Sequence, residues 1–127
     1  MQPRDITSEM FSFLAEPHLA SLTTLRSDGS PHVVPVGFSF DANTNEVRVI
    51  TSTNSQKVRN AARGGRAAVS QVDGGRWLTL EGVARVSDEA DEVALGVSGY
   101  AARYQQPKER TDRVVIIITI DRVLGRA

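Results

Sequence analysis

Six segments of the chain either alternate apolar and polar residues or are apolar over several positions, and turn-forming residues bound each of them. Such patterns are typical of β-strands, whose successive side chains point to opposite faces of a sheet. Short turns rich in Asp, Asn and Gly separate three pairs of neighbouring segments, which favours antiparallel hairpins. The predicted strands are His18–Leu25, Pro31–Phe40, Glu46–Thr51, Arg66–Val72, Arg76–Val86 and Arg113–Ile120.

Two of these strands have unusual compositions. Pro35 and Gly37 interrupt the second strand, because proline has no N–H to donate and glycine permits a bulge or the close approach of another group. We therefore expect this strand to be kinked or to lie at a sheet edge. The strand Arg113–Ile120 carries β-branched residues on both faces, which predicts a central position with both faces buried.

Three other segments have apolar residues at helical spacing. The first starts near Thr7 or Ser8, either of which can cap it, and ends at Pro17. The second, Gln56–Arg63, is expected to end at the following glycine pair. Its predicted buried residues are Val58, Ala61 and Ala62.

The third predicted helix runs from Asp88 to about Gln105 and contains two glycines, Gly96 and Gly99. Each glycine costs about 1 kcal/mol relative to alanine, so we expect either close packing at these positions or a broken helix. The apolar residues that share one face are Val93, Val97, Tyr100 and Tyr104.

Strands joined mostly by hairpins favour closure into a small barrel, because closure removes unpaired strand edges. We therefore predict a mainly β fold, a six-stranded antiparallel β-barrel with peripheral helices. The chain has the length of one ordinary domain, and no repeat or linker-like segment divides it. We expect a single domain spanning residues 1–127.

Charge and composition exclude several functional classes. Fifteen basic and fifteen acidic residues cancel, which argues against nucleic acid as the main partner. Without cysteine the chain can form no disulfide and use no thiol chemistry. The longest apolar run, Val114–Ile118, is far shorter than the ~20 residues that cross a bilayer, and the N-terminus lacks an apolar signal core. We expect a soluble, cytoplasmic protein that does not bind membranes.

A run of hydroxyl and amide side chains leads directly into the predicted helix Gln56–Arg63. The first N–H groups of a helix are unpaired and its dipole favours an anion, and here Lys57 lies in the first turn. The segment from Ile50 to Arg63 is therefore a candidate phosphate site. The alternative is an ordinary capped helix with a solvated basic face.

The segment Pro31–Gly37 is a second candidate, because a strand with two prolines leaves backbone groups free to contact a flat heterocycle. The alternative is an edge strand protected against aggregation. Trp77 is expected on the opposite face of its strand from Leu78 and Leu80. There it would stack on a ligand, cover a subunit interface or lie on the surface. Two histidines without a carboxylate pattern typical of metal ligands make a metal site implausible, and no hydrolase motif is evident.

The order of these motifs resembles the split β-barrel flavin and deazaflavin oxidoreductases, the pyridoxamine 5′-phosphate oxidase-like superfamily. The resemblance covers nearly the whole chain, and it is greatest to the actinobacterial branch that uses coenzyme F420, especially its short biliverdin reductases. The segments that carry it are Leu22–Leu25, Asp28–Val36, Ser55–Asn60, Ser70–Gly74 and Trp77–Gly82.

This resemblance implies a six-stranded split β-barrel and a homodimer, with F420 in a groove at the interface. Lys57, with the helix start at Ser55 and Gln56, would hold the cofactor phosphate. Asn60 and Arg63 would meet the phosphate or the oligoglutamate tail. The residues expected to line the deazaflavin ring are His32, Val33, Val34, Pro35, Ile50, Thr51 and Ser52, with Trp77 near the groove and Gln71 a weaker candidate.

The implied chemistry is hydride transfer from the reduced deazaflavin to a conjugated small-molecule acceptor, with biliverdin as the model substrate. The cofactor supplies the reactivity, so no catalytic acid or base is assigned. One alternative is an FMN-dependent enzyme of the same fold, because FMN also has a phosphate and a flat tricyclic ring. Another is a protein that carries F420 or a bilin without turnover.

Overall fold

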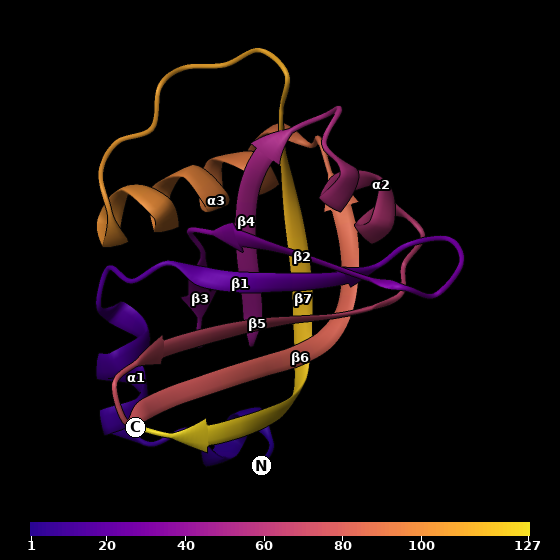
Figure 1. Ribbon diagram of the computed structural model, residues 1–127. Coiled ribbons are helices and arrows are strands. Elements are labelled where there is room, and N and C mark those ends of the chain that lie inside the picture. The colour runs from indigo at the N-terminus through magenta and orange to yellow at the C-terminus, as the bar shows by residue number, and fades with distance from the viewer.

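The structure is a computed structural model that describes residues 1–127, and its main feature is one curved antiparallel sheet with helices around it (Figure 1). Seven strands follow the order β2-β1-β5-β6-β7-β4-β3 across the sheet. The elements are η1 (Pro3–Asp5), α1 (Ser8–Ala15), β1 (Ala20–Leu25), β2 (Pro31–Val36), β3 (Ser39–Asp41), β4 (Glu46–Ser52), α2 (Gln56–Ala62), β5 (Arg66–Asp73), β6 (Arg76–Ser87), α3 (Ala90–Arg103) and β7 (Arg113–Arg126).

The seventh strand arises because the predicted strand Pro31–Phe40 is broken into β2 and β3, so the prediction of six strands is wrong. The break falls at Gly37 and Phe38. The Phe38 N–H donates to the Tyr104 hydroxyl at 3.3 Å, and its carbonyl accepts from Arg103 at 2.6 Å. Because side chains use both backbone groups of Phe38, this residue does not continue a strand ladder. The prediction of a kinked or edge strand is confirmed.

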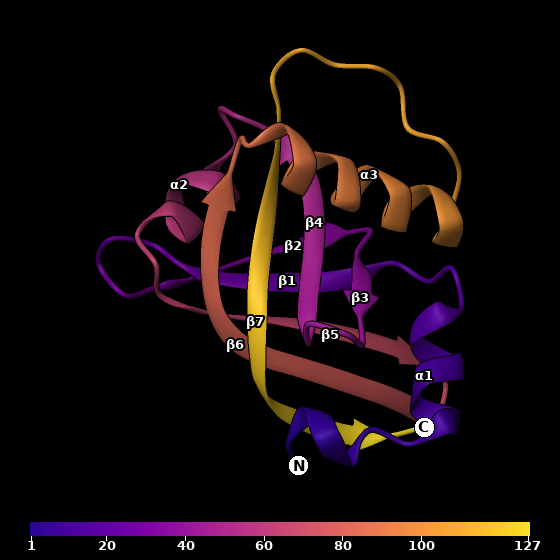
Figure 2. The same cartoon turned by 180° about the vertical axis from the view of Figure 1, so that it is seen from behind.

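The sheet curls toward a barrel without closing. β2 and β3 form its two edges and share no ladder, although only two residues of chain separate them. The register of β6 with β7 shifts between Glu81 and Gly82, and both strands bend along their length (Figure 2). A Cβ at Gly82 would lie 1.8 Å from the Thr119 carbonyl oxygen, so only glycine permits this approach.

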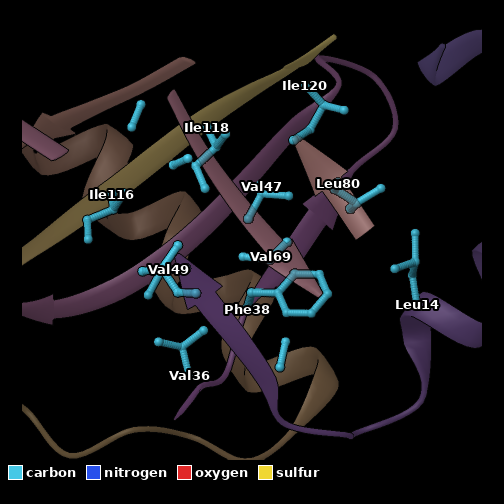
Figure 3. Close-up of a cluster of buried hydrophobic side chains, with 14 of the residues drawn as sticks. Leu14, Val36, Phe38, Val47, Val49, Val69, Leu80, Ile116, Ile118 and Ile120 are labelled. Atoms are coloured by element: carbon cyan, nitrogen blue, oxygen red, sulfur yellow. The ribbon is translucent and has the colours of Figure 1, made fainter. Parts of the chain in front are cut away.

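The hydrophobic core fills the concave side of the sheet and contains side chains from six strands, α1 and α2. Figure 3 shows many of these side chains pointing toward one another. Val114 to Ile118 in β7 are all buried, which confirms the predicted central strand. β7 also continues to Arg126, six residues beyond the predicted end, and pairs with β6 throughout this extension except at the bulge. The labelled core residues in Figure 3 are Leu14, Val36, Phe38, Val47, Val49, Val69, Leu80, Ile116, Ile118 and Ile120.

The helices occupy the rim of the sheet. α1 packs near β3, α2 lies against β1 and β6, and α3 lies against β3, β4 and β7. The close packing expected at the glycines of α3 is confirmed, because a Cβ at Gly96 would lie 2.8 Å from the Ile50 side chain and one at Gly99 2.3 Å from Ser39. None of the helices combines the length and apolar character needed to cross a membrane.

The helix α2 buries a different set of residues from the predicted one. Val58 and Ala61 are buried as expected, but Ala62 is exposed. The third buried position is Asn60, whose side chain is only 3% exposed. An amide can occupy this position because its nitrogen and its oxygen both form hydrogen bonds with neighbouring side chains.

Candidate functional site

A groove of about 400 Å³ opens between the end of β4, the start of α2, the C-terminal half of α3 and the segment that leads into β7. These elements meet at one end of the molecule, on the side away from both chain termini (Figure 1). The volume falls within the range of about 300–1,000 Å³ that is typical of small-ligand sites. The groove is lined by Ile50, Thr51, Ser52, Lys57, Tyr100, Pro107, Arg110 and Arg113.

Strand pairing and one loop contact assemble the floor of this groove. Ser52 is the register partner of Arg113, so the last residue of β4 lies beside the first residue of β7. The next residue, Thr53, donates from both its backbone N–H and its hydroxyl to the Asp112 carbonyl, at 3.0 and 2.8 Å. These bonds fix the segment that precedes β7 against the segment that precedes α2.

Lys57 is a cation without a counter-ion. Its side chain makes no hydrogen bond or ion pair within the chain, although it is partly buried in the groove. Burial lowers the pKa of the Lys57 amine below its usual value, because a buried charge loses hydration. A bound anion would offset this cost, and the site therefore has the electrostatics of an anion-binding site.

Two arginines add positive charge to the same groove. Arg110 is exposed and pairs with Asp112, at 3.0 Å between Nε and Oδ1. Arg113 donates to the Lys108 carbonyl at 2.7 Å and has no carboxylate partner. The sequence interpretation missed these arginines, together with Tyr100 and Pro107. The signal that could have found them is the basic segment Pro107–Arg113, which directly precedes the central strand.

The structure thus brings together four of the residues that were predicted from sequence, Ile50, Thr51, Ser52 and Lys57. Two more, Ser55 and Gln56, lie at the start of α2 beside the groove. The Ser55 hydroxyl donates to the Ser52 carbonyl at 3.2 Å and does not cap α2, so the helix start has no side-chain acceptor of its own. These contacts leave the prediction of an anion near this helix start open.

Asn60 and Arg63 lie on the other side of α2. The Asn60 amide donates to the Thr24 hydroxyl at 3.0 Å and accepts from Gln56 and Arg63, both at 2.8 Å. Arg63 also donates to the Leu25 carbonyl at 2.6 Å. Both residues line a separate hollow of about 80 Å³, and their polar atoms join α2 to β1.

The remaining predicted residues lie elsewhere in the chain. Gln71 is fully buried, where its amide donates to the Phe13 carbonyl at 2.8 Å and accepts from Arg103. Trp77 lies near the start of β6, opposite Val72 and Arg126, whereas α2 packs near the other end of that strand. As predicted, Trp77 is exposed while its neighbour Leu78 is buried.

The four predicted residues of β2, from His32 to Pro35, lie on an edge strand and do not line the groove. Burial alternates along this strand, with Val33 and Pro35 exposed and His32 and Val34 partly buried. The Nδ1 atom of His32 is buried and has no hydrogen-bond partner. This edge therefore offers one unsatisfied polar atom and free backbone groups on its outer side.

The groove at the end of the sheet presents cationic side chains, which suit a small anionic ligand. The match to known families makes this more specific. The family model for pyridoxamine 5′-phosphate oxidase matches residues 6–127, and the chain belongs to this family. The membership expected from the sequence motifs is confirmed.

The chain is also similar to individual proteins of known sequence or structure. The chain is 53% identical over 122 residues to an F420H2-dependent biliverdin reductase from Mycobacterium tuberculosis, covering 96% of this chain and 89% of that protein. A solved structure described as an F420 reductase is 26% identical and covers 89% of this chain and 94% of its own, with a TM-score of 0.72. A conserved hypothetical protein from Mycobacterium tuberculosis shares the fold at a TM-score of 0.80, with 24% identity and coverage of 99% and 89%.

Proposed function

We propose that the protein is a coenzyme F420-dependent reductase that transfers a hydride from the reduced deazaflavin to a conjugated acceptor such as biliverdin. The observation that carries this proposal is the uncompensated Lys57 amine in a groove that also holds two arginines. The relative named as an F420H2-dependent biliverdin reductase supports the choice of cofactor and acceptor, because it matches almost the whole chain.

The groove has the donors that an anionic cofactor needs. Lys57 and Arg113 both lack carboxylate partners, so neither has to break an ion pair within the chain before it binds a phosphate. The hydroxyls of Thr51 and Ser52 line the same space and can donate to phosphate oxygens. We assign Lys57, Thr51, Ser52 and Arg113 to the cofactor phosphate.

The flat ring requires an apolar surface next to this polar end. Ile50 and Tyr100 supply such a surface within the groove, from β4 and α3 respectively. When bound, the reduced deazaflavin supplies the hydride. The residues of the chain orient the ring, neutralise the phosphate and exclude water from one face of the site.

We further propose that two copies of the chain form a dimer, as the sequence motifs imply. The convex face of the sheet supports this, because the helices leave part of it uncovered. α1 packs near β3 and α3 lies against β3, β4 and β7, whereas β1, β2 and β5 carry exposed side chains on this face. Strand register places the large exposed residues of four strands on this same face. They are Val33, Val72, Trp77 and Leu124. In such a dimer Trp77 and the edge strand β2 would approach the groove of the partner copy.

The first experiment is a parallel fluorescence titration of the purified protein with F420 and with FMN in physiological salt. We expect micromolar or tighter F420 binding and much weaker FMN binding, followed by biliverdin reduction when F420H2 is supplied. Tighter FMN binding would assign the protein to the flavin-dependent members of the fold. Tight F420 binding without reduction of any conjugated acceptor would indicate a carrier protein.

A substitution then tests the site itself. Lys57→Ala should weaken F420 binding roughly 10- to 150-fold, which corresponds to about 1.5–3 kcal/mol for a hydrogen bond to a charged group. The matched control is Arg4→Ala, which removes one cation from the exposed η1 turn near the N-terminus. An unchanged dissociation constant for Lys57→Ala would place the phosphate elsewhere.

A further inference from the structure

Tyr100 is the one aromatic side chain that lines the groove. Its ring packs against the ring of Tyr104, with centroids 4.9 Å apart and planes tilted by 40°. The two residues are four apart in sequence, which places Tyr104 one turn further along at the C-terminal cap of α3. The Tyr100 hydroxyl makes no hydrogen bond within the chain, so it can bond to a ligand without breaking an existing contact.

Tyr104 has the opposite character, because its hydroxyl is fully used. It donates to the His18 carbonyl at 2.7 Å and accepts from the Phe38 N–H at 3.3 Å and from the Arg103 guanidinium. One donated and two accepted bonds exhaust the capacity of a phenol. Tyr104 is therefore fixed in place, whereas the Tyr100 hydroxyl in the groove has no hydrogen-bond partner.

Arg103 supports this arrangement as a partly buried cation without a carboxylate. Its guanidinium donates to the carbonyls of Glu16 (3.0 Å) and Phe38 (2.6 Å), to Tyr104 and to the Gln71 side chain. It also stacks over the Phe38 ring at 4.2 Å. These contacts join α3 to the end of α1, to the β2–β3 junction and to β5, so they hold the C-terminal end of α3 against the sheet.

The backbone at Gly37 packs against the rings of both Tyr100 and Tyr104. A Cβ at this position would lie 2.9 Å from Cε2 of Tyr100 and 3.1 Å from Cε2 of Tyr104. Both rings thus touch the backbone at the break between β2 and β3. The Tyr100 ring is confined between this backbone, the Tyr104 ring and the groove.

We propose that Tyr100 contacts the bound cofactor through its free hydroxyl, and that Tyr104 and Arg103 are positioning residues that hold the Tyr100 ring at the wall of the groove. The proposal rests on the F420-binding function proposed above. It also links the break between β2 and β3 to the shape of the groove, because Tyr100, Tyr104 and Arg103 all contact that break. Neither Tyr100 nor its two supporting residues was among the residues that the sequence motifs implied.

Three variants test the chain of contacts. Tyr100→Phe removes only the free hydroxyl and should raise the F420 dissociation constant by about 3- to 10-fold, the loss of one hydrogen bond. Tyr104→Phe leaves Tyr100 intact but releases its support, and should raise the constant by a similar factor. Gly37→Ala pushes both rings toward the groove and should weaken binding further.

The matched control for the glycine variant is Gly75→Ala. Gly75 lies in the turn between β5 and β6, has an ordinary φ angle, and a Cβ there would meet no atom within 4 Å. We expect it to bind F420 as the unchanged protein does. Thermal unfolding of every variant separates a loss of stability from a change in the folded site.

The decisive readout is the fluorescence and absorbance of bound F420 at saturation, which reports the ring environment of the folded fraction alone. A spectral change in Tyr104→Phe together with weaker binding supports a positioning role. A lower unfolding temperature with unchanged dissociation constant and spectrum would reduce Tyr104 and Arg103 to stabilising residues and overturn the proposal. If Tyr104→Phe does not fold, Arg103→Lys, which keeps the charge but not the planar fork of donors, serves as the second test.

An unchanged dissociation constant in Tyr100→Phe would overturn the assigned contact. Failure of the unchanged protein to bind F420 would instead refute the proposed function, so the two failures are distinguishable.

Discussion

Replacing the buried Asn60 by alanine tests whether this residue anchors α2 or contacts a ligand. Its side-chain amide donates to the Thr24 hydroxyl at 3.0 Å, and Thr24 is itself only 2% exposed. Its oxygen accepts from Gln56 and Arg63. Because these contacts occupy the polar atoms on both ends of the amide, we expect Asn60 to act as an anchor.

The expected cost follows from what each partner loses. Gln56 and Arg63 can reach solvent and replace their bonds with water at little cost. The Thr24 hydroxyl cannot, and an unsatisfied buried polar group costs about 1–3 kcal/mol. Alanine regains about 0.5 kcal/mol through its higher helix propensity, while the lost side-chain volume removes a similar amount of packing. The last two effects cancel, so we expect Asn60→Ala to lower the free energy of unfolding by roughly 1–3 kcal/mol.

Urea unfolding followed by circular dichroism measures this difference. Asn54→Ala, at an exposed asparagine just before α2, is the matched control and should be neutral. Thr24→Val removes the unsatisfied hydroxyl, so the double variant should be more stable than the sum of the two single losses by about 1 kcal/mol. A neutral Asn60→Ala, or strict additivity in the double variant, would refute the buried-hydroxyl argument. F420 affinity should change little, because Asn60 lines a different hollow from Lys57.

Three further outcomes follow from single features of the structure. Gly82→Ala would place a Cβ 1.8 Å from the Thr119 backbone oxygen, and urea unfolding should show a loss of more than about 3 kcal/mol, whereas Gly75→Ala should cost little. Hydrogen bonds from an arginine and a histidine lower the pKa of the Glu16 carboxyl to about 2, from about 4.5 in the unfolded chain, so the ionised carboxylate stabilises the fold above pH 4.5. The unfolding temperature should therefore fall as the pH is lowered from 4.5 to 2, and it should fall less in Glu16→Gln. A bound anion raises the depressed pKa of Lys57, so F420 affinity measured by titration should fall as the pH rises through the free-state pKa.

Local patterns were sufficient to predict most of the fold, because each depends on neighbouring residues. Thr7 caps α1 by accepting from the Met10 N–H at 3.1 Å, and the helix ends just before Pro17, both as expected. The break at Gly37 and Phe38 was only half predicted. Pro35 and Gly37 indicate a weak strand, but the bonds from Phe38 to Tyr104 and Arg103 span more than sixty positions and leave no trace in the local pattern.

The residues of the site also fall into a local group, which the sequence predicted, and a distant group, which it did not. The segment from Ile50 to Lys57 is contiguous, so its residues could be recognised together and the structure places four of them in one groove. Arg110 comes from a segment with no secondary-structure signal of its own, and Arg113 is the first residue of the predicted strand that follows this segment. Their place beside Ser52 depends on the pairing of β4 with β7, which is a property of the whole sheet.

The absence of net charge also concealed the cationic groove, since whole-chain neutrality says nothing about where the charges lie. Several carboxylates of the chain are bonded to arginines outside the groove. Each of these arginine–carboxylate pairs has no net charge. Lys57 is left without a partner, and Arg113 bonds only to a backbone carbonyl, so a neutral protein retains a local excess of positive charge. An anionic cofactor would supply the negative charge that these two side chains lack within the chain.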